Sequence, residues 1–300
     1  MLVIAPGFRE LAVTPFATLP SHLKPDVTSE WVHLNRRGST TRTFLEGPVL
    51  MPGGDLCCVD IPGGRILRVS TDCKWSEICT YDGWPNGMKL LDDGCLLVAD
   101  ARLGLVRVDP ASGRSESVLT HAVSQGFLGL NDLQVTADGA VWFTDQGQTG
   151  LHDPSGRVYR WHQGDLRCVL ERLPSPNGLR VSADGSELYV AVTRDNSVWR
   201  APLTITGQPT KVGRFASFYG PTGPDGIHID HHGFLWVCLP GADAVWVLNR
   251  KAEVVARAVF PDGAFPSNLA MDATGQRVLV TCSGAEAIYS ISPLRSQETS

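Results

Sequence analysis

The sequence lacks a long hydrophobic run, a cluster of basic residues and a Cys-x-x-Cys motif. No stretch approaches the roughly 18 apolar residues that a membrane-spanning helix needs. The 300-residue chain has a formal net charge of −5 and no basic run, so neither nucleic acid nor a membrane surface is an expected partner. Residues 1–7 contain no basic residue, and their apolar run is shorter than that of a signal peptide. We therefore expect a cytoplasmic protein.

The absence of other motifs excludes several classes of site. Without a Cys-x-x-Cys pair among the eight cysteines, neither a zinc ribbon nor a thioredoxin-type site is indicated. Most cysteines lie inside short apolar runs, as Cys58 and Cys238 do, which is typical of buried free thiols in a reducing compartment. No Gly-x-Ser-x-Gly elbow supports a serine hydrolase, and no glycine-rich phosphate loop follows a strand.

What the sequence does contain is a sixfold repeat. Six tight segments that bear Gly or Asn recur roughly 40 to 48 residues apart, which is the length of one four-stranded propeller blade. Two short apolar runs follow each segment, separated by a turn such as Asp93-Gly94. The runs alternate with strand period, and no convincing amphipathic helix appears. The segments are residues 46–48, 85–87, 130–132, 176–178, 224–226 and 266–268.

The repeat predicts an all-β fold, a six-bladed β-propeller with four antiparallel strands per blade, in a single domain over residues 1–300. The last unit ends near Pro293 and leaves no room for a fourth strand. We expect part of the N-terminal segment, residues 1–43, to supply that outer strand and close the ring. The polar tail, residues 295–300, is expected to be frayed.

Blade geometry brings the six tight segments to one mouth of the central channel, because successive connections of an up-and-down blade alternate between the two faces. The segments offer two carboxylates and several amides, which suit a hard cation, Ca²⁺ first and then Mg²⁺ or Mn²⁺. Since Asn-Gly and Asp-Gly are also good turns, the whole ring and not one segment indicates the metal site. The side chains are those of Glu46, Asn86, Asn131, Asn177, Asp225 and Asn268.

At these residues the chain resembles the senescence marker protein / gluconolactonase / luciferin-regenerating enzyme family of six-bladed propellers. The resemblance covers residues 44–294 and rests on the ordered set of motifs at 46–48, 131–132, 176–185 and 224–226. It implies one divalent cation, usually calcium, although Mg²⁺, Mn²⁺ or Zn²⁺ would also accept these ligands. It also implies hydrolysis of lactones or, in some relatives, of organophosphates. The implied metal ligands are Glu46, Asn177 and Asp225, with Asn131 as a further ligand or a contact to water and substrate.

One position departs from the family pattern. Relatives that act on sugar lactones often carry an arginine two residues before the Asn of the Asn-Asp motif, where this chain has Gly129. The resemblance therefore gives little support to an aldonic-acid substrate. Nearby aromatic residues are expected either to make a less polar pocket or to pack within the blades, and these are Trp84, Phe127, Phe218 and Tyr219.

Hydrolysis requires a group that activates water. Asp225 is the expected base, because it is a carboxylate at the centre of the predicted site. A carboxylate bound to a cation is a weak base, so His152, in the loop of residues 145–152, is a second candidate whose alternative role is that of an exposed loop residue. Substrate contacts are expected from Trp84, Asn86, Asn131, Gln146, Thr193 and Asn268.

The leading hypothesis is a metal-dependent hydrolase of ester bonds that opens a lactone with metal-activated water. The alternatives are a phosphotriester hydrolase with the same metal site, and a non-catalytic propeller that serves as a scaffold or ligand sensor. Glu46 and Asp225 argue against the scaffold, which needs no carboxylates in its channel. The expected partner is a small-molecule substrate. The sequence is compatible with either a monomer or a homodimer.

Overall fold

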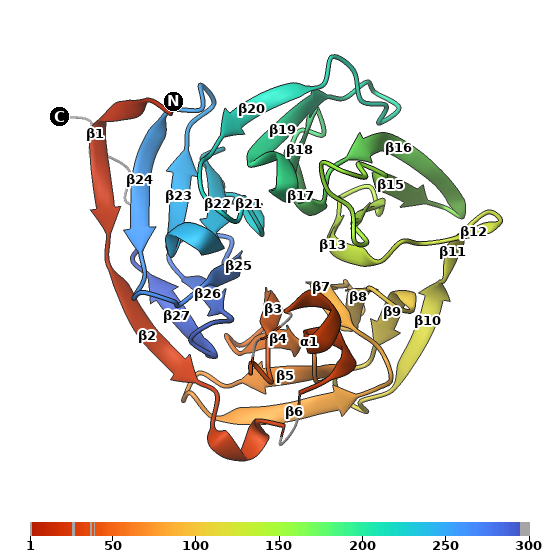
Figure 1. Ribbon diagram of the computed structural model, residues 1–300, viewed down its shortest axis with the longest axis vertical. Coiled ribbons are helices and arrows are strands. Elements are labelled where there is room, and N and C mark those ends of the chain that lie inside the picture. Colours follow the sequence, from red (N-terminus) through yellow and green to blue (C-terminus); the bar gives the residue numbers. More distant parts are fainter. Residues whose placement is uncertain (1, 26–27, 37, 39, 295–300) are drawn as a thin grey trace.

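The computed structural model of the chain describes residues 2–25, 28–36, 38 and 40–294. Its strands form six blade sheets that stand around a common axis (Figure 1). The predicted all-β, six-bladed propeller is therefore confirmed. The expectation for the tail, residues 295–300, lies outside the described residues.

Each blade begins at or just after a tight segment, and its strands then run outward from the axis in chain order. The strands of the first three blades are β3 (Leu45–Leu50), β4 (Leu56–Asp60), β5 (Arg65–Val69), β6 (Trp75–Thr80), β7 (Pro85–Leu90), β8 (Leu96–Asp100), β9 (Gly104–Val108), β10 (Ser115–Leu119), β13 (Leu130–Val135), β14 (Val141–Asp145), β15 (Gly156–His162) and β16 (Asp165–Leu173). A small separate hairpin, β11 (His121–Ala122) and β12 (Gln125–Gly126), stands between the second and third blades.

The other three blades follow the same order. Their strands are β17 (Pro176–Val181), β18 (Glu187–Val192), β19 (Ser197–Pro202), β20 (Gly213–Ser217), β21 (Ile227–Ile229), β22 (Leu235–Leu239), β23 (Ala244–Leu248), β24 (Val254–Val259), β25 (Pro266–Met271), β26 (Val278–Cys282) and β27 (Ala287–Ile291). Two short 3₁₀ turns follow the second strands of the fourth and fifth blades, η2 (Thr193–Asp195) and η3 (Pro240–Ala242).

The N-terminal segment closes the ring, as predicted. Strand β2 (Val13–Thr18) pairs antiparallel with β27 and completes the sixth blade, with Val13 opposite Ile291. The structure adds an unpredicted strand, β1 (Ile4–Leu11), which pairs in parallel with β24 and makes the fifth blade five-stranded. Figure 1 shows β1 and β2 lying along the outer edges of these two blades. The chain therefore covers two neighbouring sheet edges with one continuous segment.

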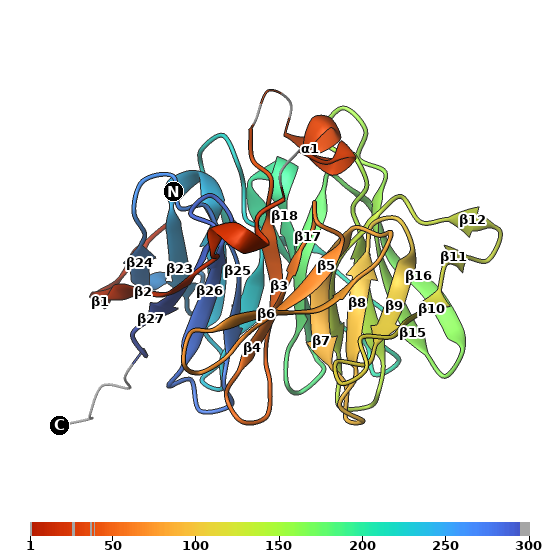
Figure 2. The ribbon, with the colours of Figure 1, turned by 90° about the horizontal axis from the view of Figure 1, so that it is seen from below.

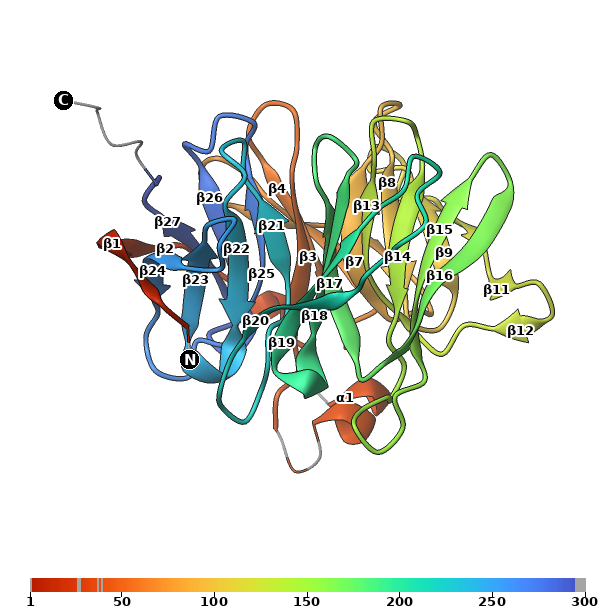
Figure 3. The ribbon, with the colours of Figure 1, turned by 90° about the horizontal axis from the view of Figure 1, so that it is seen from above.

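A short helix departs from the all-strand expectation. After the 3₁₀ turn η1 (Ser21–Leu23), the chain forms α1 (Glu30–Asn35), which stands on one face of the ring (Figures 2 and 3). Only Val32 of this helix is buried, so its sequence carries too short an apolar pattern to be found by periodicity. The helix covers the face on which the tight segments lie.

The core lies between the blades. Phe143 and Tyr159 of the third blade stack with ring centroids 5.5 Å apart, and they pack with residues of the second blade such as Leu97 and Leu105. The eight cysteines form no disulfide, and only Cys73 and Cys168 are exposed. Among the residues that the structure describes, no helix has both the length and the hydrophobicity that crossing a membrane requires.

Candidate active site at one mouth of the channel

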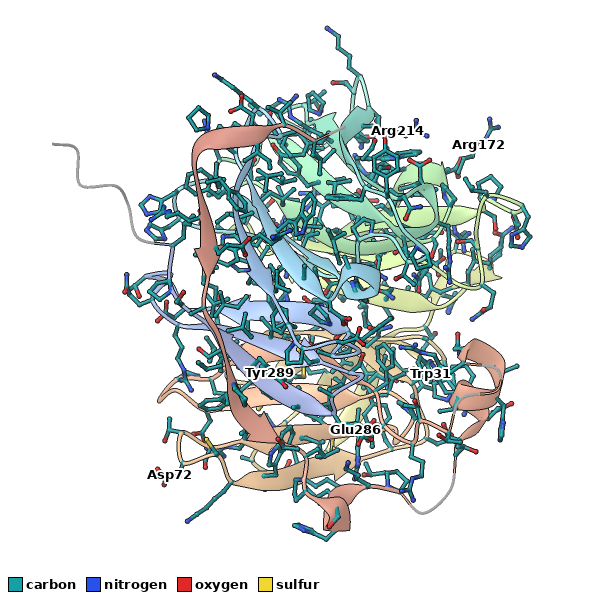
Figure 4. All side chains as sticks on the ribbon, turned by 60° about the vertical axis from the view of Figure 1, so that its left-hand side comes forward. Trp31, Asp72, Arg172, Arg214, Glu286 and Tyr289 are labelled. Atoms are coloured by element: carbon teal, nitrogen blue, oxygen red, sulfur yellow. The ribbon has the colours of Figure 1, made fainter. Side chains whose placement is uncertain are left out.

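A cavity of about 420 Å³ opens at one mouth of the channel, below α1. All six blades and α1 contribute to its wall. Residues of the loops that follow second strands, such as Ile61, Ala101 and Gln146, line it, as the alternation of blade connections predicts. Trp31, which Figure 4 shows on the side of α1 that faces the blades, lies against Phe44 with 5.2 Å between ring centroids.

Breaks in strand pairing direct the tight segments toward the cavity. In five of the six innermost strands the pairing register shifts within or beside the tight segment, as between Glu46 and Val49. Such a bulge re-aims a side chain that would otherwise follow strict alternation. Gly47 has a φ of +50°, and a Cβ there would lie 2.2 Å from the carbonyl oxygen of Asn86. Only glycine therefore fits after Glu46.

Two carboxylates occupy the floor of the cavity. Glu46 is 4% exposed, and Asp225 lines the same cavity from the segment that precedes β21. Burial raises the pKa of Glu46 to about 8, and the charge of Asp225 adds to this rise. Burial also raises the pKa of Asp225, to about 7. Neither carboxylate forms an ion pair with a described lysine, arginine or histidine.

Amide side chains hold these carboxylates and one another in place. Oε2 of Glu46 accepts a 2.9 Å hydrogen bond from Nδ2 of Asn268, and the carboxylate of Asp225 is hydrogen-bonded to Asn177. Nδ2 of Asn131 donates to Oε1 of Gln146 at 2.9 Å. With its nitrogen engaged in this way, the Asn131 amide has its carbonyl oxygen available to the cavity.

The donor set fits a hard divalent cation. Carboxylate and amide oxygens from Glu46, Asn131, Asn177 and Asp225 line one cavity. Two neighbouring carboxylates with raised pKa values, one buried and one half-buried, are the environment that a cation stabilises. No cluster of three or more His, Cys, Asp or Glu side chains occurs among the described residues, so a cation here would depend on the amide oxygens as well as on the carboxylates.

Most of the expected substrate contacts come together, and one does not. Trp84, Asn86, Asn131, Gln146 and Thr193 all line the cavity. By contrast, Asn268, which was also expected to contact substrate, does not line the cavity and is only 3% exposed. A Cβ on Gly226 would lie 2.3 Å from the Asn268 amide, so the neighbouring backbone covers it. In this position Asn268 orients Glu46 and does not face substrate.

His152 and three of the aromatic residues also lie elsewhere. His152 is exposed and lines an adjoining hollow of about 570 Å³. That hollow shares lining residues such as Gln146 and Arg194 with the cavity of Glu46 and Asp225, although His152 itself does not line the cavity. Phe127 packs on Phe143, and Phe218 packs on Trp246. Phe127 and Phe218 therefore pack within the blades, which is one of the two roles expected for the aromatic residues. Tyr219 is 81% exposed on another part of the surface.

The sequence did not point to several residues of the cavity. Arg36, at the end of α1, and Arg194, in η2, both line it, together with Phe44 and Phe265. Arg36 lies outside the repeat, so repeat spacing carries no signal for it. Arg194 directly follows Thr193, in a loop that the repeat places at this mouth. The expected position of Thr193 therefore could have indicated that Arg194 lies at the cavity.

The opposite end of the channel has a different character. Lys89, Arg180 and His228 line a hollow of about 560 Å³ on that face, and Nη1 of Arg180 lies 3.2 Å from Oδ2 of Asp132. Burial, with Arg180 next in effect, lowers the pKa of Lys89 to about 8 and that of His228 to about 3. The lowered pKa makes His228 a neutral side chain of the channel.

The fold and the site together define a propeller protein with an oxygen-rich centre inside one mouth of its channel. Residues 44–284 match the family described as the SMP-30/gluconolactonase/LRE-like region, and the chain belongs to that family.

Similar proteins agree with this assignment. The chain is 28% identical over 273 residues to a gluconolactonase of Zymomonas mobilis, an alignment that covers 80% of this chain and 76% of the relative. It is also 28% identical over 263 residues to the lactonase drp35 of Staphylococcus saprophyticus, with 82% and 78% covered. Among solved structures, a calcium-binding protein of Agrobacterium tumefaciens, regucalcin, superposes with a TM-score of 0.70 at 23% identity, covering 83% of this chain and 89% of that one.

Proposed function

We propose that this protein is a metal-dependent lactonase, a hydrolase that opens cyclic esters with water in the channel cavity. The observation that carries the proposal is the pairing of Glu46 and Asp225, two carboxylates without an ion-pair partner among the described residues, in one cavity. Burying like charges together is costly unless a cation compensates them. The names of the similar proteins, gluconolactonase and lactonase, support the same chemistry.

The cation would be held by oxygens of Glu46, Asn177 and Asp225, with Asn131 as a further ligand or a contact to water. Calcium is favoured because the donors are all oxygen and because amide oxygens take part. When bound, the cation supplies Lewis-acid stabilisation of the negative charge that develops on a lactone carbonyl oxygen.

The protein's own side chains position the reactants and move the proton. Asp225 accepts a proton from the attacking water, whose oxygen forms the new bond to the carbonyl carbon. The ring C–O bond then breaks, the proton passes to the departing alkoxide oxygen, and the product is a hydroxy acid. Trp84, Asn86 and Thr193 lie on the cavity wall where they would contact the ring.

We assign Glu46 the role of a cation ligand and not of the base, because two hydrogen-bond donors already engage its carboxylate. Its Oε2 accepts hydrogen bonds from the Gly47 backbone at 2.5 Å and from Asn268 at 2.9 Å, and these bonds favour the ionised form. His152, outside the cavity wall, would reach the reaction only through intervening water, so Asp225 is the stronger candidate for the base.

A panel assay on metal-stripped protein tests the proposal. Ca²⁺, Mg²⁺, Mn²⁺ and Zn²⁺ are restored in turn, and hydrolysis of five- and six-membered lactones and of a phosphotriester is followed by acid release. Cation-dependent hydrolysis of a lactone, strongest with calcium, is expected. Turnover of the phosphotriester alone would favour the second hydrolase, and no turnover of any compound with any cation would favour a scaffold or sensor.

A further inference from the structure

An arginine lines the cavity without an ion pair to any described residue. The side chain of Arg36 packs against two aromatic rings that meet edge to face, with its Cζ 4.6 Å from the ring centroid of Phe44 and 4.4 Å from that of Phe265. Its guanidinium forms no hydrogen bond or ion pair with any of the described residues. A half-buried guanidinium with five unused donors is costly to desolvate, and an oxyanion would satisfy it.

The aromatic corner beside Arg36 is fixed by the blades. The backbone N–H of Phe44 donates to Oδ1 of Asp60 at 2.9 Å, and that of Phe265 donates to Oδ1 of Asp243 at 2.7 Å. Two rings held in this way form a fixed aromatic corner against which the guanidinium packs. Arg36 is therefore held in place by the blades, as a ligand-binding arginine is, and differs from a solvated surface arginine.

A second arginine, Arg194, adds positive charge at the same cavity. Arg194 lines the cavity from η2 on the fourth blade, and, like Arg36, it lowers the pKa of Asp225 through its charge. Its side chain also has no ion-pair partner in the described part of the chain.

The charges around the cavity do not balance once a cation is bound. Its charged lining residues are Arg36, Glu46, Arg194 and Asp225. The two carboxylates compensate a divalent cation, so the charge of both arginines is left for the substrate. A partly enclosed site with uncompensated positive charge favours an anion.

We propose that the natural substrate is a lactone that carries an oxyanion, a carboxylate or a phosphate, outside the ring, and that Arg36 binds this group with Arg194 assisting. This inference rests on the lactonase function proposed above. The planar fork of Arg36 offers paired hydrogen bonds to either oxyanion, and Arg36 lines the same cavity as the two carboxylates.

Three lactones with the same ring test the proposal: one with a neutral CH₂OH substituent, one with a carboxylate in its place and one with a phosphate ester. The calcium-loaded wild type is expected to show a higher kcat/KM for at least one anionic compound than for the neutral one. Arg36→Gln should reduce this anionic-over-neutral ratio by about 10- to 100-fold, mainly through KM, because charge-assisted hydrogen bonds are lost. Arg36→Lys should restore part of the ratio, and Arg194→Gln should reduce it less.

The matched control is Arg172→Gln, an exposed arginine at the outer edge of the third blade, away from α1 (Figure 4). The anionic-over-neutral ratio of kcat/KM in this variant should equal that of the wild type. Equal kcat/KM for anionic and neutral lactones in the wild type, or a ratio that Arg36→Gln leaves unchanged, overturns the proposal. The preferred anionic compound also shows whether carboxylate or phosphate is the group.

Calorimetric titration with the same compounds separates this inference from the lactonase proposal. If no lactone is hydrolysed but an anionic lactone binds in an Arg36-dependent manner, the lactonase proposal fails and the anion site stands. If lactones are hydrolysed and anions bind no better than the neutral compound, the lactonase proposal stands and the anion site fails. If neither hydrolysis nor Arg36-dependent binding occurs, both fail.

Discussion

Nδ2 of Asn268 donates a hydrogen bond of 2.9 Å to Oε2 of Glu46 across 222 positions of sequence. The sixth blade thus orients a carboxylate of the first blade, at the place where the ring closes. Because Glu46 is buried, this donor fixes the orientation in which its other oxygen faces the cavity. Closure of the propeller and assembly of the candidate metal site are therefore the same structural event.

Replacing Asn268 should weaken cation binding without removing a ligand. Asn268→Leu has a similar volume but no donor, so Glu46 loses the partner that orients it. Loss of such a supporting hydrogen bond typically costs about 10- to 100-fold in metal affinity. Calcium affinity measured by calorimetry should fall by this factor, whereas Asn249→Leu, which removes an amide from a loop of the fifth blade that bonds Glu253, should leave it unchanged. An unaltered affinity in Asn268→Leu would contradict this role.

Substituting the carboxylates should have opposite effects with and without metal. At pH 8.5, above the pKa values of about 8 and about 7, Glu46→Gln and Asp225→Asn each remove one of two neighbouring like charges, so the metal-free variants should melt about 2–4 °C higher than the wild type, as expected for roughly 1 kcal/mol. Each change also removes a charged oxygen ligand, so calcium should no longer raise the melting temperature as it does in the wild type.

Thermal unfolding by circular dichroism, with chelator and with excess calcium, measures both effects. If neither variant alters metal content or the calcium-induced shift in melting temperature, Glu46 and Asp225 do not form a metal site. Asp165→Asn, a change to an exposed carboxylate of the third blade, serves as the control for loss of negative charge.

The sequence indicated the repeat, the closing strand and the four candidate ligands, because each depends on spacing that recurs in every blade. It assigned Asn268 to substrate and did not indicate its hydrogen bond to Glu46, although Asn177 and Asn268 occupy equivalent segments. Asn268 turns to Glu46 because the two blades meet there and the backbone of Gly226 covers its amide. Such contacts between distant segments leave no periodic signal.

The N-terminal segment was predicted only where it repeats the blade pattern. Strand β2 fills a position that every blade must have, and it was foreseen. Strand β1 adds a parallel edge that no other blade possesses, and α1 brings Arg36 to the cavity from outside the repeat. Gly129, where an arginine was expected by resemblance, has a φ of +144°, a conformation that disfavours any larger side chain. Positive charge reaches the cavity from Arg36 and Arg194 instead.

The metal-free protein should lose stability as the pH rises. The folded-state pKa values of Glu46, about 8, and of Asp225, about 7, lie above their ordinary values of 4.5 and 3.8. The folded state therefore binds protons more tightly than the unfolded state, so the stabilising effect of protonation is complete below about pH 4 and is lost as the pH passes through 7 and 8.

Melting temperatures between pH 5.5 and 8.5, measured in chelator, test this dependence. The metal-free wild type should melt at progressively lower temperature across this range, and Asp225→Asn should show a smaller decrease. Excess calcium should oppose the decrease, because it binds the ionised carboxylates. A metal-free melting temperature that is constant or rises over this range would show that the two groups ionise freely.

Lys89 should oppose cation binding from the other end of the channel. Its side chain is half-buried, without a hydrogen-bond partner in the described part of the chain, and the charge of Glu46 acts on it. Lys89→Met keeps the length of the side chain and removes the positive charge. Because a like charge near a cation site lowers affinity, calcium affinity should rise by about 3- to 10-fold in this variant.

The same substitution should stabilise the metal-free fold, since it removes an ammonium whose burial lowers its pKa to about 8. Calorimetry of calcium binding and thermal melting in chelator measure the two effects independently. Lys74→Met, at an exposed lysine of the first blade, controls for a change in net charge and should alter neither quantity. A calcium affinity that is unchanged or lower in Lys89→Met would mean that the charge of Lys89 does not reach the metal site, and that the two ends of the channel are electrostatically independent.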